Sequence, residues 1–371
     1  MNTRSLANND DARFMAVALT LGRRGLGRAW PNPAVGAVVV NNGIIAGRGW
    51  TQPGGRPHAE TEALRRAGAL ARSGTLYVTL EPCSHSRKTP PCTDAVIEAG
   101  ITRVVSPLAD PNPLVAGAGH WRLAERGIAV EVGLAALEAR RAHAGHIRHM
   151  QDGRPHVTLK IALSADSKVA LAGRRPAVIT GGRSRNRVHL MRAMNDAVLT
   201  GIGTVLADDP LLTCRLPGMH SPVRVVLDGQ LRLPLGSRLA ASAQAVPLWV
   251  ITGDRAPRER EQALKMRGID VQRVGEPAGR LDLVAALRVL AERGITRLMV
   301  EAGPILAASL VRADLVDEAA LFHARTPIGA GGIDALDSLP LSTLTQSPQL
   351  RRLACEALGD DSLETFERPL L

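Results

Sequence analysis

The chain is poor in aromatic residues and in lysine. It has three Phe, four Trp and one Tyr among 371 residues, and only four of its 46 basic residues are Lys. Proteins that bind RNA or single-stranded DNA commonly stack bases on aromatic side chains. We therefore expect no nucleic-acid partner, although the formal charge is +11. A compositional bias toward Arg, Ala and Gly explains that charge at least as well as an anionic partner does.

Long apolar runs are also missing. No run approaches the ~20 residues that span a bilayer, and the N-terminal stretch MNTRSLANNDDARFM lacks the apolar centre of a signal peptide. Four Cys in a chain of this length do not make a disulfide framework. We expect a cytoplasmic protein with no membrane partner.

The length of the chain favours two domains. Apolar runs on either side of Asn41-Asn42-Gly43 predict a hairpin, and a polar stretch at 151–155 predicts a joint. We place a first α/β domain at 1–150 and a second at 151–371. The expected helices are 11–21, 58–71 and 93–99, and the expected strands are 34–40, 44–50, 75–80, 102–107, 156–163, 223–228, 248–252 and 297–300.

Three residues of the first domain have the pattern of a catalytic zinc site. His58 opens the second expected helix, Cys83 follows a strand, and Cys92 begins the next helix. Three protein ligands leave tetrahedral zinc one open position, where the pKa of water falls to ~7. Glu60 lies beside this site, so its carboxylate can pass a proton from water to a leaving amine.

The same residue types, H-x-E followed by P-C and a second Cys, characterise zinc nucleobase deaminases. Eight residues separate Cys83 from Cys92, and this longer loop contains His85 and Lys88. His85 is a possible fourth ligand, but we expect it to face the substrate because the open position must stay open. His143, His146 and His149 recur every third residue, and we interpret them as a solvated helix face near the joint.

Several motifs resemble the bifunctional deaminase/reductase family of riboflavin biosynthesis. PNPAVGAVVV, HAE, EPCSHSRKTPPC and DPNPLVAGAG are similar to its deaminase half, and LKIALSADSKVA, VLTGIGTVLADDPLLTCR and VEAGP to its reductase half. The resemblance implies a cytidine-deaminase-like three-layer sandwich followed by a dihydrofolate-reductase-like α/β domain. It also implies a phosphorylated pyrimidine substrate, Zn²⁺ and NADPH, and we expect a homo-oligomer.

In the family, 2,5-diamino-6-ribosylamino-4(3H)-pyrimidinone 5′-phosphate loses its 2-amino group as ammonia, with Glu60 as the implied proton shuttle. NADPH then reduces the ribosyl to a ribityl side chain. The implied substrate contacts are Asn32, His85, Lys88 and Asn112 in the first domain and Leu212, Arg215 and Glu301 in the second. The implied cofactor contacts are Ala162, Thr204, Asp208, Gly303, Pro304, Ile305, Leu306, Ala307, Ala308 and Ser309.

The residues of the second domain independently suggest a phosphate-binding site. Gly201-Ile202-Gly203-Thr204 follows an expected strand, and Glu301-Ala302-Gly303-Pro304 joins a strand to a helix whose free N–H groups can hold phosphate. Arg215 can clamp a phosphate through two nitrogens. Arg183 and Arg185 are candidates for reading the 2′-phosphate of NADPH.

The second domain also departs from the family. Pro176-Ala177-Val178 stands where Ser-x-Trp is usual, and Ala165-Asp166-Ser167 stands where Leu-Asp-Gly is usual. Alongside the bifunctional enzyme, the sequence therefore leaves open a deaminase whose reductase domain is weakened or idle. A nucleic-acid-editing protein is a further alternative, which the scarcity of aromatics disfavours.

Overall fold

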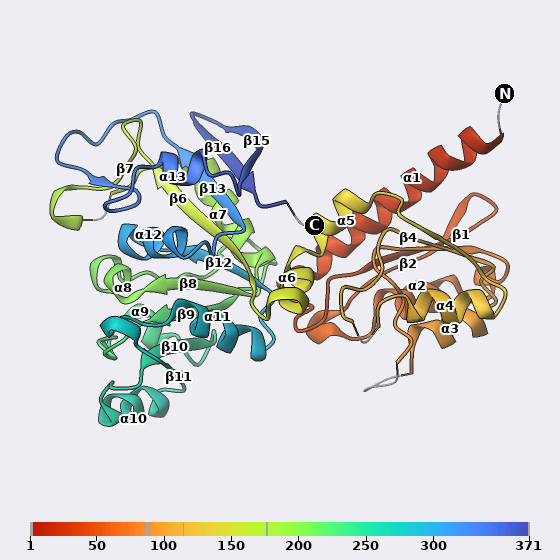
Figure 1. The fold of residues 1–371 in the computed structure, drawn as a ribbon, viewed down its shortest axis with the longest axis horizontal. Helices are drawn as coiled ribbons and strands as arrows, with labels where there is room; N and C mark the ends of the chain where they lie inside the picture. Colours follow the sequence, from red (N-terminus) through yellow and green to blue (C-terminus); the bar gives the residue numbers. More distant parts are fainter. Residues whose placement is uncertain (1–2, 86–89, 114, 176, 370–371) are drawn as a thin grey trace. The chain divides into compact units, whose positions relative to one another are not determined.

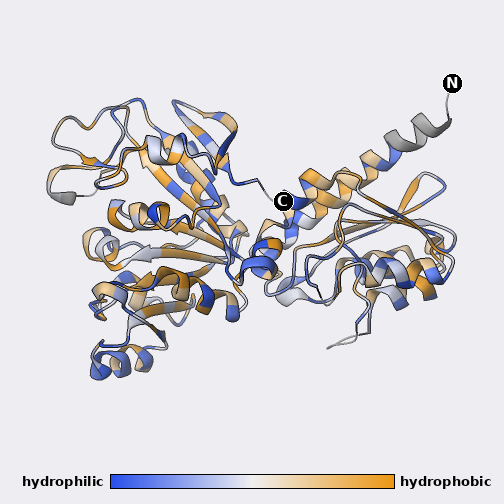
Figure 2. Ribbon diagram, viewed as in Figure 1, coloured by the Kyte–Doolittle hydropathy of each residue, from blue (hydrophilic) through white to orange (hydrophobic). Residues whose placement is uncertain are grey.

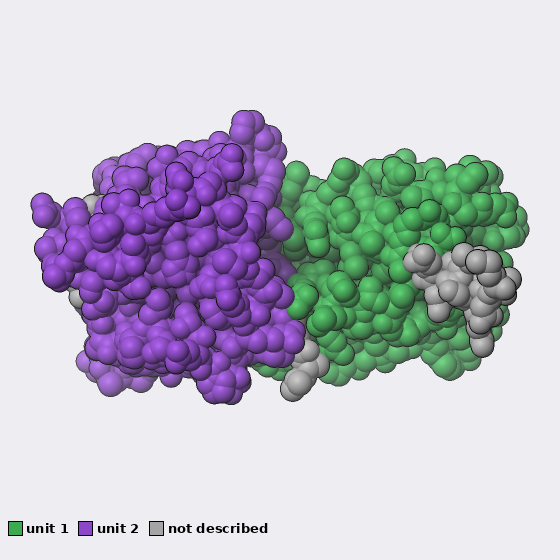
Figure 3. Space-filling model, turned by 90° about the horizontal axis from the view of Figure 1, so that it is seen from above, with its two compact units in different colours: residues 1–153, 370 green, residues 154–369, 371 purple. Residues whose placement is uncertain are grey.

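The computed structural model describes residues 3–85, 90–113, 115–175 and 177–369. Lys88 and Pro176 lie outside these ranges. The described chain divides into two compact units, of which unit 1 ends at Gly153 and unit 2 begins at Arg154 (Figure 3). Among the described residues, no helix is both long and apolar enough to cross a membrane.

Unit 1 contains a sheet of five strands within the described residues, in the order β2-β1-β3-β4-β5. The strands are β1 (Gly36–Asn41), β2 (Ile44–Trp50), β3 (Thr75–Val78), β4 (Arg103–Ser106) and β5 (Ala129–Val132). The helices are α1 (Thr3–Gly22), α2 (Ala59–Ala67), α3 (Cys92–Glu98), α4 (Ala118–Glu125), α5 (Ala136–Ala142) and α6 (Ala144–Asp152), with 3-10 turns at Arg23–Gly25, Pro53–Gly55 and Gly68–Ala71.

Helices cover both faces of this sheet. Helix α1 packs with α5 on one side, and α2, α3 and α4 follow one another on the other side (Figure 1). Helix α2 lies very close to β2, since a Cβ on Gly49 would come within 2.1 Å of the Ala59 carbonyl oxygen. Glycine in β2 therefore fixes the start of α2, where His58 and Glu60 are found.

The sequence predicted most of unit 1 correctly. The hairpin of β1 and β2 is confirmed, with a bulge between Val39 and Val40. The expected helix at 58–71 is α2 followed by a 3-10 turn, and the expected helix at 11–21 begins earlier, at Thr3. Helix α4 and strand β5 were not predicted. Both elements are short, and their residues are mostly polar or exposed, so they lack a clear apolar pattern.

Unit 2 is built on a sheet of nine strands within the described residues, in the order β11-β10-β9-β8-β12-β6-β13-β16-β15. The strands are β6 (His156–Leu163), β8 (Ala197–Gly201), β9 (Val223–Leu227), β10 (Leu248–Gly253), β11 (Asp270–Val274), β12 (Arg297–Glu301), β13 (Glu318–His323), β15 (Arg351–Leu358) and β16 (Asp361–Glu367), and β7 (Lys168–Ala170) pairs separately with β14 (Ile333–Asp334). The helices are α7 (Gly182–Met194), α8 (Ile202–Asp208), α9 (Arg238–Ala241), α10 (Arg258–Met266), α11 (Leu283–Glu292), α12 (Pro304–Arg312) and α13 (Ser342–Thr345), with 3-10 turns at Ala172–Arg174 and Pro277–Gly279.

The strands from β11 to β13 in this order are all parallel, and β16 is antiparallel to both of its neighbours, β13 and β15. The central strands read as continuous apolar runs because both faces of a parallel sheet are covered. Figure 2 shows this hydrophobic centre, whereas α10 at the margin is mostly hydrophilic. Since parallel strands end at one edge, β6, β8 and β12 bring their carboxyl ends together, and ligands bind at such edges.

Candidate active sites

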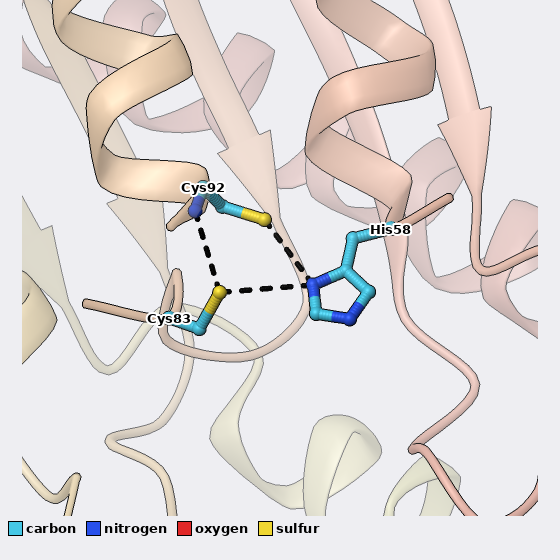
Figure 4. A group of neighbouring side chains, drawn as sticks. All are labelled: His58, Cys83 and Cys92. Atoms are coloured by element: carbon cyan, nitrogen blue, oxygen red, sulfur yellow. Dashed lines mark hydrogen bonds between the residues drawn. The ribbon is translucent and has the colours of Figure 1, made fainter. Parts of the chain in front are cut away.

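Unit 1 brings three of the predicted metal ligands together. His58 precedes the first residue of α2, Cys92 is the first residue of α3, and Cys83 lies in the segment after β3. Their ligand atoms all lie within 4.8 Å of one another (Figure 4). The Nδ1 atom of His58 is 3.2 Å from the Cys92 sulfur and 3.7 Å from the Cys83 sulfur.

These separations fit zinc. With Zn–S of ~2.3 Å and Zn–N of ~2.05 Å, tetrahedral geometry places nitrogen and sulfur about 3.6 Å apart. The Cys92 thiol donates toward Cys83 and lowers the pKa of the Cys83 thiol, and His58 and the Cys92 N–H act in the same direction. The thiolate is the form that binds metal, so the structure favours the ligand form of Cys83.

Glu60 lies in the first turn of α2 and is only 4% exposed. Burial raises the pKa of its carboxyl, which the neighbouring His58 partly offsets. A carboxyl group with a raised pKa binds a proton more readily, so it can accept a proton and return it. Its place beside the ligand cluster therefore suits the predicted proton shuttle.

Asn32 lies against the imidazole of His58. Its side-chain nitrogen donates to the Gly55 carbonyl oxygen at 2.8 Å and is 3.3 Å from Nε2 of His58. Thus Asn32, expected on resemblance to contact substrate, lies directly against the predicted metal ligand His58. Among the described residues, the buried Nδ1 atom of His85 has no hydrogen-bond partner.

The interpretation of the later histidines as a solvated face is wrong. His143 and His146 are 2% and 8% exposed. The Nε2 atom of His143 is 2.9 Å from the Thr79 carbonyl oxygen, and that of His146 is 3.1 Å from the Asp110 carboxylate. The three-residue spacing of these histidines does not indicate their burial, because their hydrogen-bond partners, Thr79 and Asp110, come from distant segments of the chain.

Glu81 belongs to no predicted site, yet its carboxylate is fully buried and accepts backbone hydrogen bonds from the segment that contains Asn112. Its position two residues before Cys83, directly after a buried strand, was the available signal. A charged residue there needs partners that only the folded chain supplies.

Unit 2 has a polar cluster at the carboxyl end of β12. Glu301, the last residue of that strand, is opposite Lys160 of β6 in the strand register. Arg192 of α7 forms a two-pronged ion pair with Glu301, at 2.5 and 2.9 Å. Burial would raise the pKa of Glu301, but Arg192 outweighs it and the pKa is lowered. Burial lowers the pKa of Lys160. Arg192 was not predicted as a site residue, because no local pattern distinguishes it from the many other Arg residues of the chain.

Arg215 is connected to this cluster by a chain of contacts through His189 and the Thr213 carbonyl oxygen. The Nε atom of Arg215 is 3.2 Å from Nε2 of His189, whose Nδ1 is 3.2 Å from the Thr213 carbonyl oxygen. The same carbonyl accepts a hydrogen bond from Arg192 at 2.9 Å. Leu212 has φ +55° and its side chain is buried in the core of unit 2.

The predicted cofactor residues lie near the end of β6, on α8, and from Gly303 into α12. Thr204 accepts a hydrogen bond from the Gly303 N–H at 3.2 Å, which joins the first turn of α8 to the short loop after β12. Ala162 is half-buried near the end of β6, and Asp208 is the exposed last residue of α8. Pro304, Ile305 and Leu306 form the first turn of α12. Further along, Ala307 and Ala308 are buried in the core, and the Ser309 hydroxyl donates to the Ile305 carbonyl oxygen.

Within the segments of unit 2 that depart from the family, Asp166 keeps the usual residue type, whereas Ser167 and Val178 do not. Asp166 accepts hydrogen bonds from Ser164, Ile328 and Gly329, and the first of these contributes most to lowering its pKa to about 2. Ser167, where the family has Gly, has φ +61°. Val178 is 87% exposed.

The two candidates for the 2′-phosphate are both exposed. Arg185 donates to the Thr180 carbonyl oxygen at 3.3 Å, and the stem of Arg183 lies against Gly359.

The geometry defines the class of protein. A sheet covered on both faces with a His/Cys/Cys cluster is the architecture of zinc-dependent deaminases, and residues 8–107 match the cytidine and deoxycytidylate deaminase zinc-binding region. Residues 155–363 match the RibD C-terminal domain.

Comparison with individual proteins identifies the family. The chain is 40% identical to riboflavin biosynthesis protein RibD of Escherichia coli (strain K12), covering 95% of this chain and 97% of that protein. It is 39% identical to RibD of Aquifex aeolicus, covering 96% and 98%. RibD of Acinetobacter baumannii, form 1, is similar in structure with a TM-score of 0.86 and 34% identity, covering 98% of this chain and all of that one. The chain belongs to the RibD family, which confirms the predicted fold class.

Proposed function

We propose that this chain is a bifunctional enzyme of riboflavin biosynthesis. Residues 1–150 act as the zinc-dependent deaminase and residues 151–371 as the NADPH-dependent reductase. The substrate is 2,5-diamino-6-ribosylamino-4(3H)-pyrimidinone 5′-phosphate. The observation that carries the proposal is the convergence of His58, Cys83 and Cys92, which are spread over 34 residues of sequence, beside the buried Glu60.

In the deaminase, His58, Cys83 and Cys92 hold the metal. When bound, zinc lowers the pKa of water to ~7, so that a nucleophile is available at neutral pH. Glu60 takes a proton from the attacking water and gives it to the departing amine, so that water and the C–NH2 group become C=O and ammonia. Asn32, His85, Lys88 and Asn112 bind the pyrimidine and its ribose phosphate.

In the reductase, NADPH supplies the hydride that converts the ribosyl to the ribityl side chain. The cofactor contacts we propose are Thr204 in the first turn of α8 and Gly303 before α12, together with Ala162, Asp208 and the first residues of α12. Glu301, Leu212 and Arg215 contact substrate, and the Arg192 pair supports the proposal because it holds the Glu301 carboxylate in one orientation.

The test mixes purified enzyme, the diaminopyrimidine phosphate and NADPH. We expect ammonia release followed by NADPH oxidation. The second candidate, a deaminase with an idle reductase unit, is favoured by the exposed Val178, where the family has Trp. It would release ammonia and leave NADPH unconsumed.

We also propose a homo-oligomer in the cytoplasm. Strand β15 is an edge of the sheet, and its first seven residues are exposed, which makes it available for pairing with another chain. The two cysteine ligands need a reducing compartment. Sedimentation that shows only monomers at micromolar concentration would contradict the first proposal, and cell fractionation tests the second.

A further inference from the structure

We propose that Glu81 is a positioning residue for substrate binding in the deaminase. It holds the substrate loop, defined as residues 110–113 and 115–117, at a fixed distance from the metal ligand Cys83. This inference rests on the proposed function, in which Asn112 of that loop binds the pyrimidine phosphate.

The Glu81 side chain has no solvent exposure. One of its carboxylate oxygens accepts hydrogen bonds from the N–H groups of Asp110 at 2.8 Å and Gly117 at 2.9 Å. The other accepts from the N–H groups of Gly119 at 2.7 Å and His120 at 3.4 Å. A buried carboxylate with four backbone donors is a strong anchor, because hydrogen bonds to a charged group are about twice as strong as neutral ones.

The carboxylate also lies at the N-terminus of α4. Gly117 precedes that helix with φ +80°, and Gly119 belongs to its first turn. Negative charge at this position is favoured by the helix dipole. The protein thus satisfies the first N–H groups of α4 with a side chain from a segment 36 residues earlier.

Gly119 shows how tightly the two segments fit. A Cβ at this position would come within 2.0 Å of the Pro82 carbonyl oxygen and 3.1 Å of a Glu81 carboxylate oxygen. Any larger residue would push the start of α4 away from the segment that contains Cys83. The substrate loop and the metal ligand are therefore parts of one packed unit.

The loop is held at its other side by Asp110. The Asp110 carboxylate accepts a hydrogen bond from the Asn112 N–H at 2.9 Å and lies 3.1 Å from Nε2 of His146. Glu81 accepts a hydrogen bond from the backbone of Asp110, and the Asp110 side chain in turn holds the backbone of Asn112. Glu81 therefore positions Asn112 through Asp110. Loss of Glu81 should release the Asn112 side chain from its position while His58, Cys83 and Cys92 stay in place.

The test is steady-state deamination by full-length, zinc-loaded Glu81→Gln, which keeps the shape of the side chain but turns one acceptor into a donor. We expect KM to rise at least tenfold, kcat to stay within threefold, and one zinc per chain to remain. Glu62→Gln is the matched control, because Glu62 is also buried in unit 1 but pairs with Arg65 and Arg66. Its KM should equal that of wild type.

A double-mutant cycle with Asn112→Ala tests the route of the effect. If Glu81 acts through Asn112, the two KM increases will not multiply. An unchanged KM in Glu81→Gln, a loss of zinc, or fully multiplicative effects overturns the inference. If Glu81→Gln does not fold, Glu81→Asp, which keeps the charge but is one methylene shorter, takes its place with the same criteria. Failure of wild type to deaminate would instead overturn the proposed function.

Discussion

The substitution Glu60→Gln tests the chemistry of the deaminase most sharply. The two side chains have nearly the same shape, and Glu60 is only 4% exposed, so the fold and the three ligands should be preserved. The change removes only the ability to accept and return a proton. Positioned acid–base groups contribute about 10²–10⁴-fold to rate, which corresponds to roughly 3–5 kcal/mol of transition-state free energy at ~1.36 kcal/mol per tenfold.

The assay is ammonia release at saturating substrate, together with zinc determination on the same preparation. We expect one zinc per chain in Glu60→Gln and a kcat lowered by at least a hundredfold. Glu62→Gln, on the same helix, is the control and should retain full activity. A Glu60→Gln enzyme with full zinc and a rate within threefold of wild type would refute the assigned proton transfer.

Three further predictions concern unit 2. Arg192→Met leaves the Glu301 carboxylate without its main partner. Because both side chains are only 12% exposed, we expect the free energy of unfolding to fall by about 3–5 kcal/mol and NADPH oxidation to be lost. A free energy of unfolding of unit 2 that changes by less than about 1 kcal/mol would contradict this prediction. Ser167→Gly should stabilise the protein by about 1 kcal/mol. The left-handed conformation of Ser167 costs Ser about 1–2 kcal/mol, and the larger loss of chain entropy by Gly on folding offsets part of that gain. A lower melting temperature would show that the Ser side chain has another role. Burial, then the charges of Arg192 and Arg215, lower the pKa of His189, so the unfolded state binds more protons. The stability of unit 2 should therefore fall as pH drops below about 6.5, and His189→Gln should reduce that slope, whereas identical slopes would exclude His189 as the cause.

Residues close to one another in the chain were the easiest to predict. The turn at Asn41-Asn42-Gly43 and the helix start at His58 have local signals, and the three ligands could be selected because His and Cys beside element ends are rare. The structure then added what no local pattern contains. Glu81 needs the backbone of a loop about 30 residues later, and His146 needs Asp110, so neither role was visible in sequence.

The reductase site shows the same limit. Lys160 and Glu301 are 141 residues apart in sequence, and only the pairing of β6 with β12 brings them together. Glu301 was selected on family resemblance, whereas Arg192 was hidden among many arginines whose side chains are mostly solvated. Contacts made across a sheet depend on strand order, which a single sequence does not specify.

The central claim is that one chain carries out both reactions in order, and a single stoichiometry tests it. With excess diaminopyrimidine phosphate and NADPH, the enzyme should oxidise one NADPH for each ammonia released. Removal of zinc by a chelator should stop both, while NADPH oxidation should persist if the deaminated pyrimidine is supplied instead. Oxidation of NADPH by the zinc-free enzyme acting on the diaminopyrimidine, or ammonia release without any NADPH oxidation, would contradict the account.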